Sequence, residues 1–172
     1  MRMLAHKRRR QSGSMAIEVA MWLPVMFLLI VGTLQFGKIT YTYYTLTKIV
    51  NTAAAYLAAQ SGVNFCPDAG DANITAAFNF AVSGASDGSG TPIITDLTAD
   101  MLTVTTQCID PTTGELADCA VSGCSTPVGA QRPDFITVSL PNGYTVQPRI
   151  PYLLLDPIPL RPKSTVAYGG GS

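Results

Sequence analysis

Histidine is almost missing from this chain of 172 residues, in which His6 is the single example. An imidazole is the usual general base of hydrolytic triads and the commonest metal ligand. His6 lies in a basic N-terminal segment that we interpret as a leader, and a chain without this leader has no histidine, which excludes His-based triads, Cys–His nucleophiles and His-ligated metals. The sequence also has no glycine-rich phosphate loop of the Walker type. We therefore expect a protein that is not an enzyme, takes no cofactor and has no small-molecule substrate.

Charge is also scarce, and it is unevenly distributed. Charged residues make up 13% of the chain and apolar residues 47%, a balance typical of membrane-linked or secreted proteins. Five of the eleven Lys and Arg residues lie in the first ten positions, whereas residues 63–172 carry four basic and ten acidic side chains, a net charge of −6. This acidic balance argues against binding to nucleic acid, which requires a basic face.

The longest apolar run predicts a membrane span. Residues 15–36 contain one ionisable side chain, Glu18. As a helix, these 22 residues would be about 33 Å long, which is enough to cross a hydrocarbon core of about 30 Å. No A-x-A-like site follows closely, so we expect an uncleaved anchor rather than a secretory signal removed at its far end. The basic cluster at residues 6–10 places the N-terminus in the cytoplasm and everything after Lys38 outside.

The cysteines all follow this span. An even number on the oxidising side of a membrane predicts two disulfides, for which three connectivities exist; the four residues are Cys66, Cys108, Cys119 and Cys124. We expect Cys119 to pair with Cys124 in a small loop and Cys66 to pair with Cys108. Zinc is the weaker alternative, because the spacings are not CxxC pairs and no His accompanies them. Calcium binding by Asp110, Glu115 and Asp118 is weak as well, because their spacing does not match the EF-hand.

Glu18 requires an explanation because a carboxylate at the centre of a membrane helix costs about 2.5–3.5 kcal/mol. One hypothesis is that Glu18 lies near enough to the cytoplasmic end to reach water. The other is that it meets a positive partner inside the membrane. If a peptidase cuts after Gly13, Ser14 becomes a charged amino terminus and Glu18 becomes the fifth residue of the mature chain. The Ser14 amine of one subunit then neutralises the Glu18 carboxylate of another.

A basic leader, a Gly and a Glu at the fifth position after it resemble a type IV prepilin or pseudopilin. The finer pattern is similar to the TadE-like family of the tight-adherence (Tad) pilus system. The residues that carry this resemblance are Gly13, Ala16, Ile17, Glu18, Ala20, Pro24, Leu28, Leu29, Gly32, Gln35, Phe36 and Gly37. The chain departs from the family at Val19, where Phe is common, and at Gln35, where Glu is common.

The resemblance implies a non-catalytic minor pilin or pseudopilin that takes part in the assembly or priming of a Tad pilus. Its implied partners are the bacterial inner membrane, a prepilin peptidase and other pilin or pseudopilin subunits. It implies a single-pass protein with a cytoplasmic N-terminus and an outer C-terminal domain, incorporated in some cases into a surface pilus. The alternative is an unprocessed single-pass protein whose outer domain binds another envelope component.

The predicted fold class is α+β, in four parts: a basic leader (1–13), a transmembrane helix that continues as an amphipathic helix (14–61), a small, mainly-β extracytoplasmic domain with one short helix (62–168) and a flexible tail (169–172). Apolar residues recur at spacings of four and three along the continuing helix, at Ile39, Tyr43, Leu46, Val50, Ala53 and Leu57. We expect this stripe to pack on the protein's own outer domain, on neighbouring helices, or on each along part of its length. The tyrosines of residues 41–44 predict an aromatic belt at the outer membrane surface.

Within the outer domain, Asp71 and Gly84 predict the start and end of a short helix with Ile74, Ala77, Phe78 and Ala81 on one face. Segments rich in Val, Ile and Thr predict strands at 93–97, 101–109, 135–140, 144–148 and 164–168. Asn142-Gly143 predicts a two-residue hairpin between the third and fourth of them. Residues 147–163 contain five prolines, so we expect this segment to wrap the domain edge and to form neither a helix nor a central strand.

Overall fold

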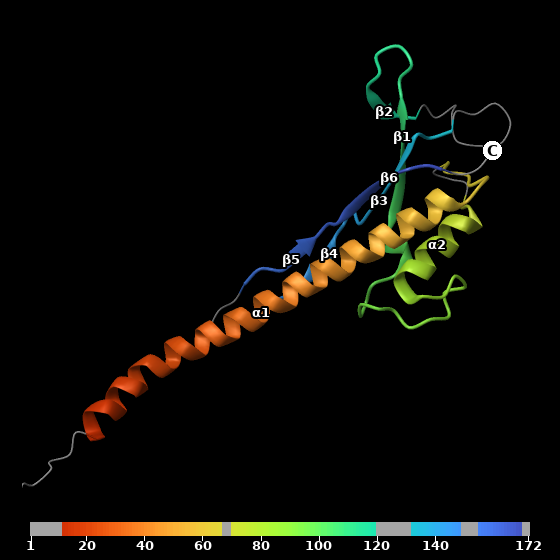
Figure 1. Cartoon of the computed structure of the whole chain (residues 1–172). Coiled ribbons are helices and arrows are strands. Elements are labelled where there is room, and N and C mark those ends of the chain that lie inside the picture. Colours follow the sequence, from red (N-terminus) through yellow and green to blue (C-terminus); the bar gives the residue numbers. More distant parts are fainter. Residues whose placement is uncertain (1–11, 67–69, 120–131, 149–154, 170–172) are drawn as a thin grey trace, which may run out of the picture.

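One long helix, α1 (Ser12–Ala59), connects the N-terminal part of the chain to the folded domain (Figure 1). The computed structural model describes residues 12–66, 70–119, 132–148 and 155–169, and the side chains from residue 15 onward. The 48 residues of α1 correspond to about 72 Å of helix. The helix ends two residues before the predicted Ser61, where the Gln60 N–H donates to the Leu57 carbonyl, and Gly62 then turns the chain with a φ of 73°.

The apolar stripe of α1 is fully buried on the domain only along its C-terminal part, although Ile39 is partly buried against the same core. Leu46, Val50, Ala53 and Leu57 are fully buried, whereas Tyr43 is 48% exposed. α1 contacts α2 (Ala72–Ser83) on one side and two strands of the main sheet on another. From residue 46 onward, the stripe therefore packs on the protein's own domain, as one of the two hypotheses predicted.

The short helix α2 begins and ends where the sequence predicted. The Asp71 carboxylate accepts a hydrogen bond from the Asn73 N–H at 2.7 Å, which caps the helix, and another from the Asn64 N–H at 2.7 Å. Gly84 closes the helix with a φ of 79°. Buried against α1 and the sheet are Ala77, Phe78, Ala81 and Val82.

The main sheet is antiparallel, with the strand order β2-β1-β3-β6. Its strands are β1 (Thr103–Ile109), β2 (Leu116–Asp118), β3 (Phe135–Ser139) and β6 (Lys163–Ala167). Ile136 and Val138 of β3 are fully buried and contribute to the core shared with α1. The α+β class with one long helix, one short helix and a small antiparallel sheet domain is confirmed.

The predicted strand at residues 93–97 is wrong. The Ile93 N–H donates to the Val82 carbonyl at 2.9 Å, so the start of the segment is bonded to the C-terminal end of α2. It then turns, with the Leu97 N–H bonded to the Ile94 carbonyl and Asp96 at a φ of 63°. Leu97 is fully buried, so the segment contributes one core side chain in place of an alternating strand face. A short 3₁₀ turn, η1 (Ala99–Met101), leads from here into β1.

The predicted hairpin at Asn142-Gly143 is also wrong. A turn does form there, because the Gly143 N–H donates to the Leu140 carbonyl at 3.1 Å and Gly143 has a φ of 73°. However, β3 already pairs with β1 on one edge and with β6 on the other. The next strand, β4 (Tyr144–Val146), therefore leaves the sheet and pairs with β5 (Ile158–Leu160), which lies in the proline-rich segment.

The disulfide pairing differs from the expected one. Cys108 is bonded to Cys119 across the β1–β2 hairpin, next to the register pair Cys108–Ala117. Cys66 is also disulfide-bonded. Because Cys108 is already paired, the expected Cys66–Cys108 and Cys119–Cys124 bonds are both wrong, and Cys124 itself lies outside the described residues.

Candidate functional site

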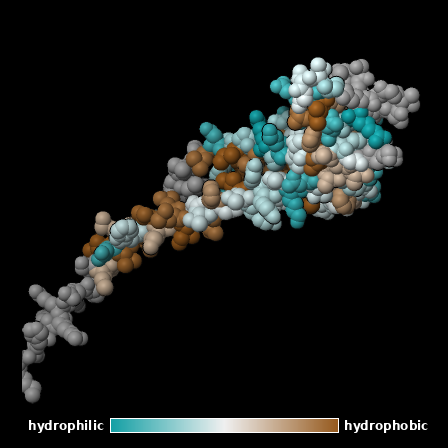
Figure 2. Space-filling view, turned by 45° about the horizontal axis from the view of Figure 1, so that its top comes forward, coloured by the Kyte–Doolittle hydropathy of each residue, from teal (hydrophilic) through white to brown (hydrophobic). Residues whose placement is uncertain are grey.

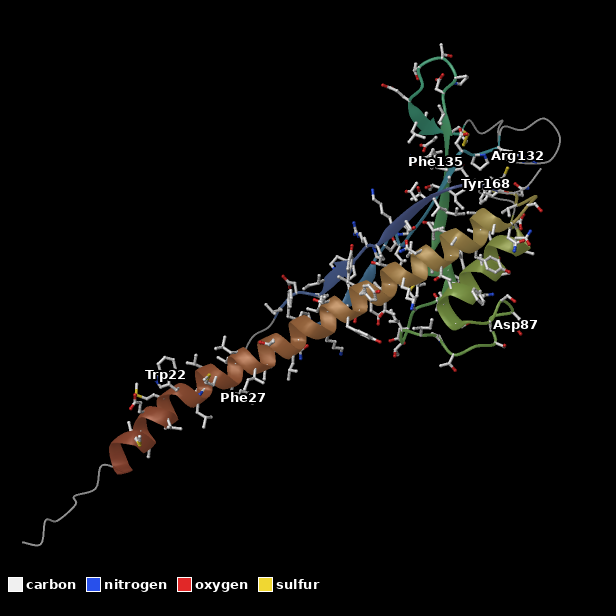
Figure 3. All side chains as sticks on the ribbon, in the orientation of Figure 1. Trp22, Phe27, Asp87, Arg132, Phe135 and Tyr168 are labelled. Atoms are coloured by element: carbon white, nitrogen blue, oxygen red, sulfur yellow. A yellow bond between two sulfur atoms is a disulfide. The ribbon has the colours of Figure 1, made fainter. Side chains whose placement is uncertain are left out.

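The part of α1 that precedes the domain presents apolar side chains to the surroundings on every side. It projects away from the folded domain (Figure 1), and hydrophobic residues cover most of its surface (Figure 2). Trp22, 62% exposed, and Phe27, 51% exposed, point outward from different sides of the helix (Figure 3). The most apolar stretch of this segment is not covered by any other described part of the chain. By length and composition this helix can cross a membrane.

Glu18 is the one ionisable residue in this apolar segment. It shares one face of α1 with Met15, Val19, Trp22, Leu23 and Met26. Every large side chain on that face is more than half exposed, so no part of the described fold covers the carboxylate. No described residue forms an ion pair with it. If Glu18 pairs with a positive group, that group belongs either to a segment outside the described residues or to a second molecule.

The two predicted processing residues, Gly13 and Ser14, lie in the first turn of α1, just before this face. Glu18 follows Ser14 by four residues, which is about one helical turn, or 6 Å along the axis. Residues four apart lie on the same face of a helix, so the Ser14 amine is within reach of Glu18 in its own chain as well as of a neighbouring helix staggered by about one turn. The pairing of Ser14 with Glu18 between subunits therefore stays a prediction.

The threonine hydroxyls of α1 are bonded within the helix. Six threonines donate to the carbonyl four residues earlier at 2.7–3.0 Å: Thr33, Thr40, Thr42, Thr45, Thr47 and Thr52. For Thr33, the one of the six within the apolar segment, the bond removes the cost of taking an unpaired hydroxyl into lipid. α1 also runs through Pro24, which has no N–H to bond the Ala20 carbonyl.

Above the apolar segment, α1 carries the residue types of a membrane–water boundary. Lys38 follows the span, and Tyr41 and Tyr44 are 72% and 69% exposed. Amphipathic rings and long cationic side chains at this position are typical of an interfacial belt. The sequence did not reveal that this belt borders a groove, because the groove also requires Phe80 and Ile93, which lie about forty residues later in the chain.

The similarity to known proteins falls on this same helix. The family model described as TadE-like protein matches residues 13–55. This segment is similar to the TadE-like family. The match begins at Gly13, includes Glu18 and the whole apolar segment, and ends within the part of α1 that packs on the domain. The TadE-like segment covers 43 of 172 residues and leaves the outer domain unmatched. No match was found among curated proteins or among solved structures.

The disulfide between Cys108 and Cys119 links two neighbouring strands. The Cys108–Cys119 bond closes the β1–β2 hairpin, and the Asp134 carboxylate accepts the Ile109 N–H next to it. At the hairpin loop, the Asp110 carboxylate accepts the N–H groups of Thr112 at 2.7 Å and Thr113 at 3.3 Å, and these bonds lower the pKa of Asp110. Within the described ranges, no three His, Cys, Asp or Glu side chains gather in an arrangement that can hold a metal ion.

Proposed function

We propose that the protein is a non-catalytic minor pilin or pseudopilin that takes part in the assembly or priming of a tight-adherence pilus. The TadE-like match over residues 13–55 carries the proposal and supports involvement in the Tad pilus system. The exposed apolar part of α1 supports a single-pass anchor in the inner membrane. We place the N-terminus in the cytoplasm and the domain outside, where the Cys108–Cys119 bond is chemically stable.

In this proposal, a prepilin peptidase cuts after Gly13 and the mature chain begins at Ser14. Removal of the five basic residues of the leader removes the charges that hold this end in the cytoplasm. The new amine of Ser14 neutralises the Glu18 carboxylate of a neighbouring subunit. Glu18 supports this step because it lies on an uncovered apolar face with no ionic partner among the described residues.

The experiment that tests processing is an intact-mass measurement of the protein recovered from cells that assemble the pilus. We expect a chain that begins at Ser14, and we expect Gly13→Val to leave the leader in place. A chain that still begins at Met1 in those cells would contradict the proposal. That result would favour the second candidate, an unprocessed anchor whose outer domain binds another envelope component. The exposed surface of that domain is the observation that keeps this alternative open.

A further inference from the structure

Asn142 and Gly143 lie in an exposed turn that the proposed function does not use. The chain has five asparagines, and four of them precede a β-branched or aromatic residue: Asn51, Asn64, Asn73 and Asn79. A glycine has no Cβ, so its backbone nitrogen can approach the side chain of the preceding residue closely. Asn142 is therefore the asparagine whose side-chain amide is most open to attack by the next backbone nitrogen.

The side chain of Asn142 is free to take part in such a reaction. Asn142 is exposed to water, and within the described ranges its side-chain amide forms no hydrogen bond. By contrast, the side-chain amides of Asn64 and Asn79 are each bonded to the backbone of another residue. Asn142 thus combines a small following residue with a side chain that can rotate.

The backbone of the turn opposes the attack. The Gly143 N–H donates to the Leu140 carbonyl at 3.1 Å, which closes a turn with Pro141 at its second position and Asn142 at its third. A Cβ added to Gly143 would lie 2.9 Å from Cγ of Arg161, so the turn packs closely against that side chain. The Gly143 nitrogen must lose its proton and rotate toward the Asn142 side chain to react. The hydrogen bond to Leu140 must therefore break first.

Asp87 is the other acidic or amide residue that precedes a glycine, and it can close the same five-membered ring (Figure 3). Its carboxylate accepts hydrogen bonds from the Ser89 N–H at 3.0 Å and from the Ser89 hydroxyl at 2.8 Å. These bonds lower the pKa of Asp87, and ring closure requires the uncharged carboxyl group. Asp87 should therefore react more slowly than Asn142.

We propose that Asn142 is a modification site that loses its side-chain amide spontaneously, at a rate set by the opening of the turn. The Gly143 nitrogen bonds to Cγ of Asn142, the Cγ–Nδ2 bond breaks, and the amide nitrogen leaves as ammonia with the proton that Gly143 has lost. Water then opens the cyclic imide at either carbonyl and gives aspartate or isoaspartate. Each product adds a negative charge beside β4, and isoaspartate also lengthens the backbone by a methylene group. The reaction does not depend on the anchor, on processing or on the pilus role.

The test follows the full chain in detergent in mildly alkaline buffer, folded in one sample and unfolded by urea in the other. Peptide mapping by mass spectrometry measures the conversion of each asparagine, and enzymatic carboxyl methylation detects isoaspartate. In the folded chain, we expect Asn142 to convert faster than the other asparagines and than Asp87. Its rate should be about two- to tenfold below that in the unfolded chain, the factor that corresponds to one hydrogen bond. Faster conversion at another of these residues, no conversion of Asn142 in the folded chain, or equal rates in the two states would overturn the proposal.

Pro141→Ala separates the opening of the turn from the chemistry of the Asn-Gly pair. The variant keeps Asn142 and Gly143, but it removes the ring that fixes φ at the second position of the turn. We expect the rate in the folded chain to rise about two- to fivefold and the rate in the unfolded chain to stay the same. Asn142→Gln is the control, and it should abolish the conversion at this position. An unchanged rate in folded Pro141→Ala, or an equal rise in both states, would overturn control by the turn.

Discussion

Glu18 is the residue whose chemistry separates an anchor from an assembly subunit. In Glu18→Gln, the side chain keeps its size and is cheaper to bury, so an anchor that only tolerates the carboxylate should be unaffected. If the carboxylate pairs with the Ser14 amine of another subunit, the variant leaves that amine buried and unpaired, at a cost of about 3–5 kcal/mol. We then expect normal processing and a normal membrane level, with loss of co-purification with the pilus components.

Glu18→Asp is the matched control for this variant because it keeps the charge, and it should retain part of the co-purification. Normal co-purification of Glu18→Gln at a normal membrane level would show that the carboxylate is not an assembly contact. In that case, the position of Glu18 one turn inside the helix end would be explained by its reach to water alone.

Asp110 gives the hairpin loop a dependence on pH. The backbone N–H groups of Thr112 and Thr113 donate to its carboxylate and lower its pKa from the ordinary value of 3.8. A carboxyl group with a lowered pKa in the folded state stabilises the loop above its unfolded pKa, and this contribution disappears as the pH falls through the folded pKa. The Thr112 amide resonance should therefore titrate at a pH below 3.8. A Thr112 amide that does not change with pH in this range, or that behaves identically in Asp110→Asn, would contradict the assignment.

The pairing of the cysteines depends on strand register, which the residues alone do not show. Cys119 and Cys124 are near one another in sequence, and that proximity favoured the wrong bond. The hairpin brings Cys119 back beside Cys108, so register decides the pairing. The register of the β1–β2 hairpin was not predictable, because the three residues of β2 are all exposed and show no buried face.

At the scale of elements, the helices were predictable and the strand partners were not. The period of apolar residues marks both helices, and Asp71, Gly84 and Gly62 mark their ends through local chemistry. Strand pairing depends on which edges are free. Nothing near Asn142 shows that both edges of β3 are occupied, because one partner comes from the far C-terminal strand β6. Glu18 was identifiable from sequence for the opposite reason, since a single charge in an apolar run needs no tertiary information.

The docked part of α1 should dominate the stability of the domain. Leu57 of α1 is fully buried in the core that α1 shares with α2 and the sheet. Leu57→Ala should therefore destabilise the domain by about 2–5 kcal/mol. Leu29→Ala, at a residue 62% exposed in the apolar segment, makes the same chemical change without leaving a cavity in the domain. Urea unfolding of the two variants in detergent, followed by near-UV circular dichroism, measures the difference. Equal midpoints would contradict the assigned core.

At the scale of the whole molecule, the chain has two parts that require different solvents. The buried residues of the core begin at Leu46, and the continuous apolar surface ends at Phe36. A chain that starts at residue 37 should therefore be soluble, should contain the Cys108–Cys119 bond and should not sediment with membranes. Aggregation of this shorter chain, or loss of its folded structure, would show that the span contributes to the domain core. The full chain is the control, and it should sediment with membranes.

The continuity of α1 has a mechanical consequence. The span and the buried stripe belong to one helix without a hinge at the membrane surface, so a pull on the membrane end reaches the domain directly. The stripe runs parallel to the helix axis, and a force along that axis loads its contacts in shear. Leu46, Val50, Ala53 and Leu57 then resist together and do not separate one after another, as they would if the helix were peeled sideways. Such a joint is strongest against tension along the axis and weakest against a sideways load.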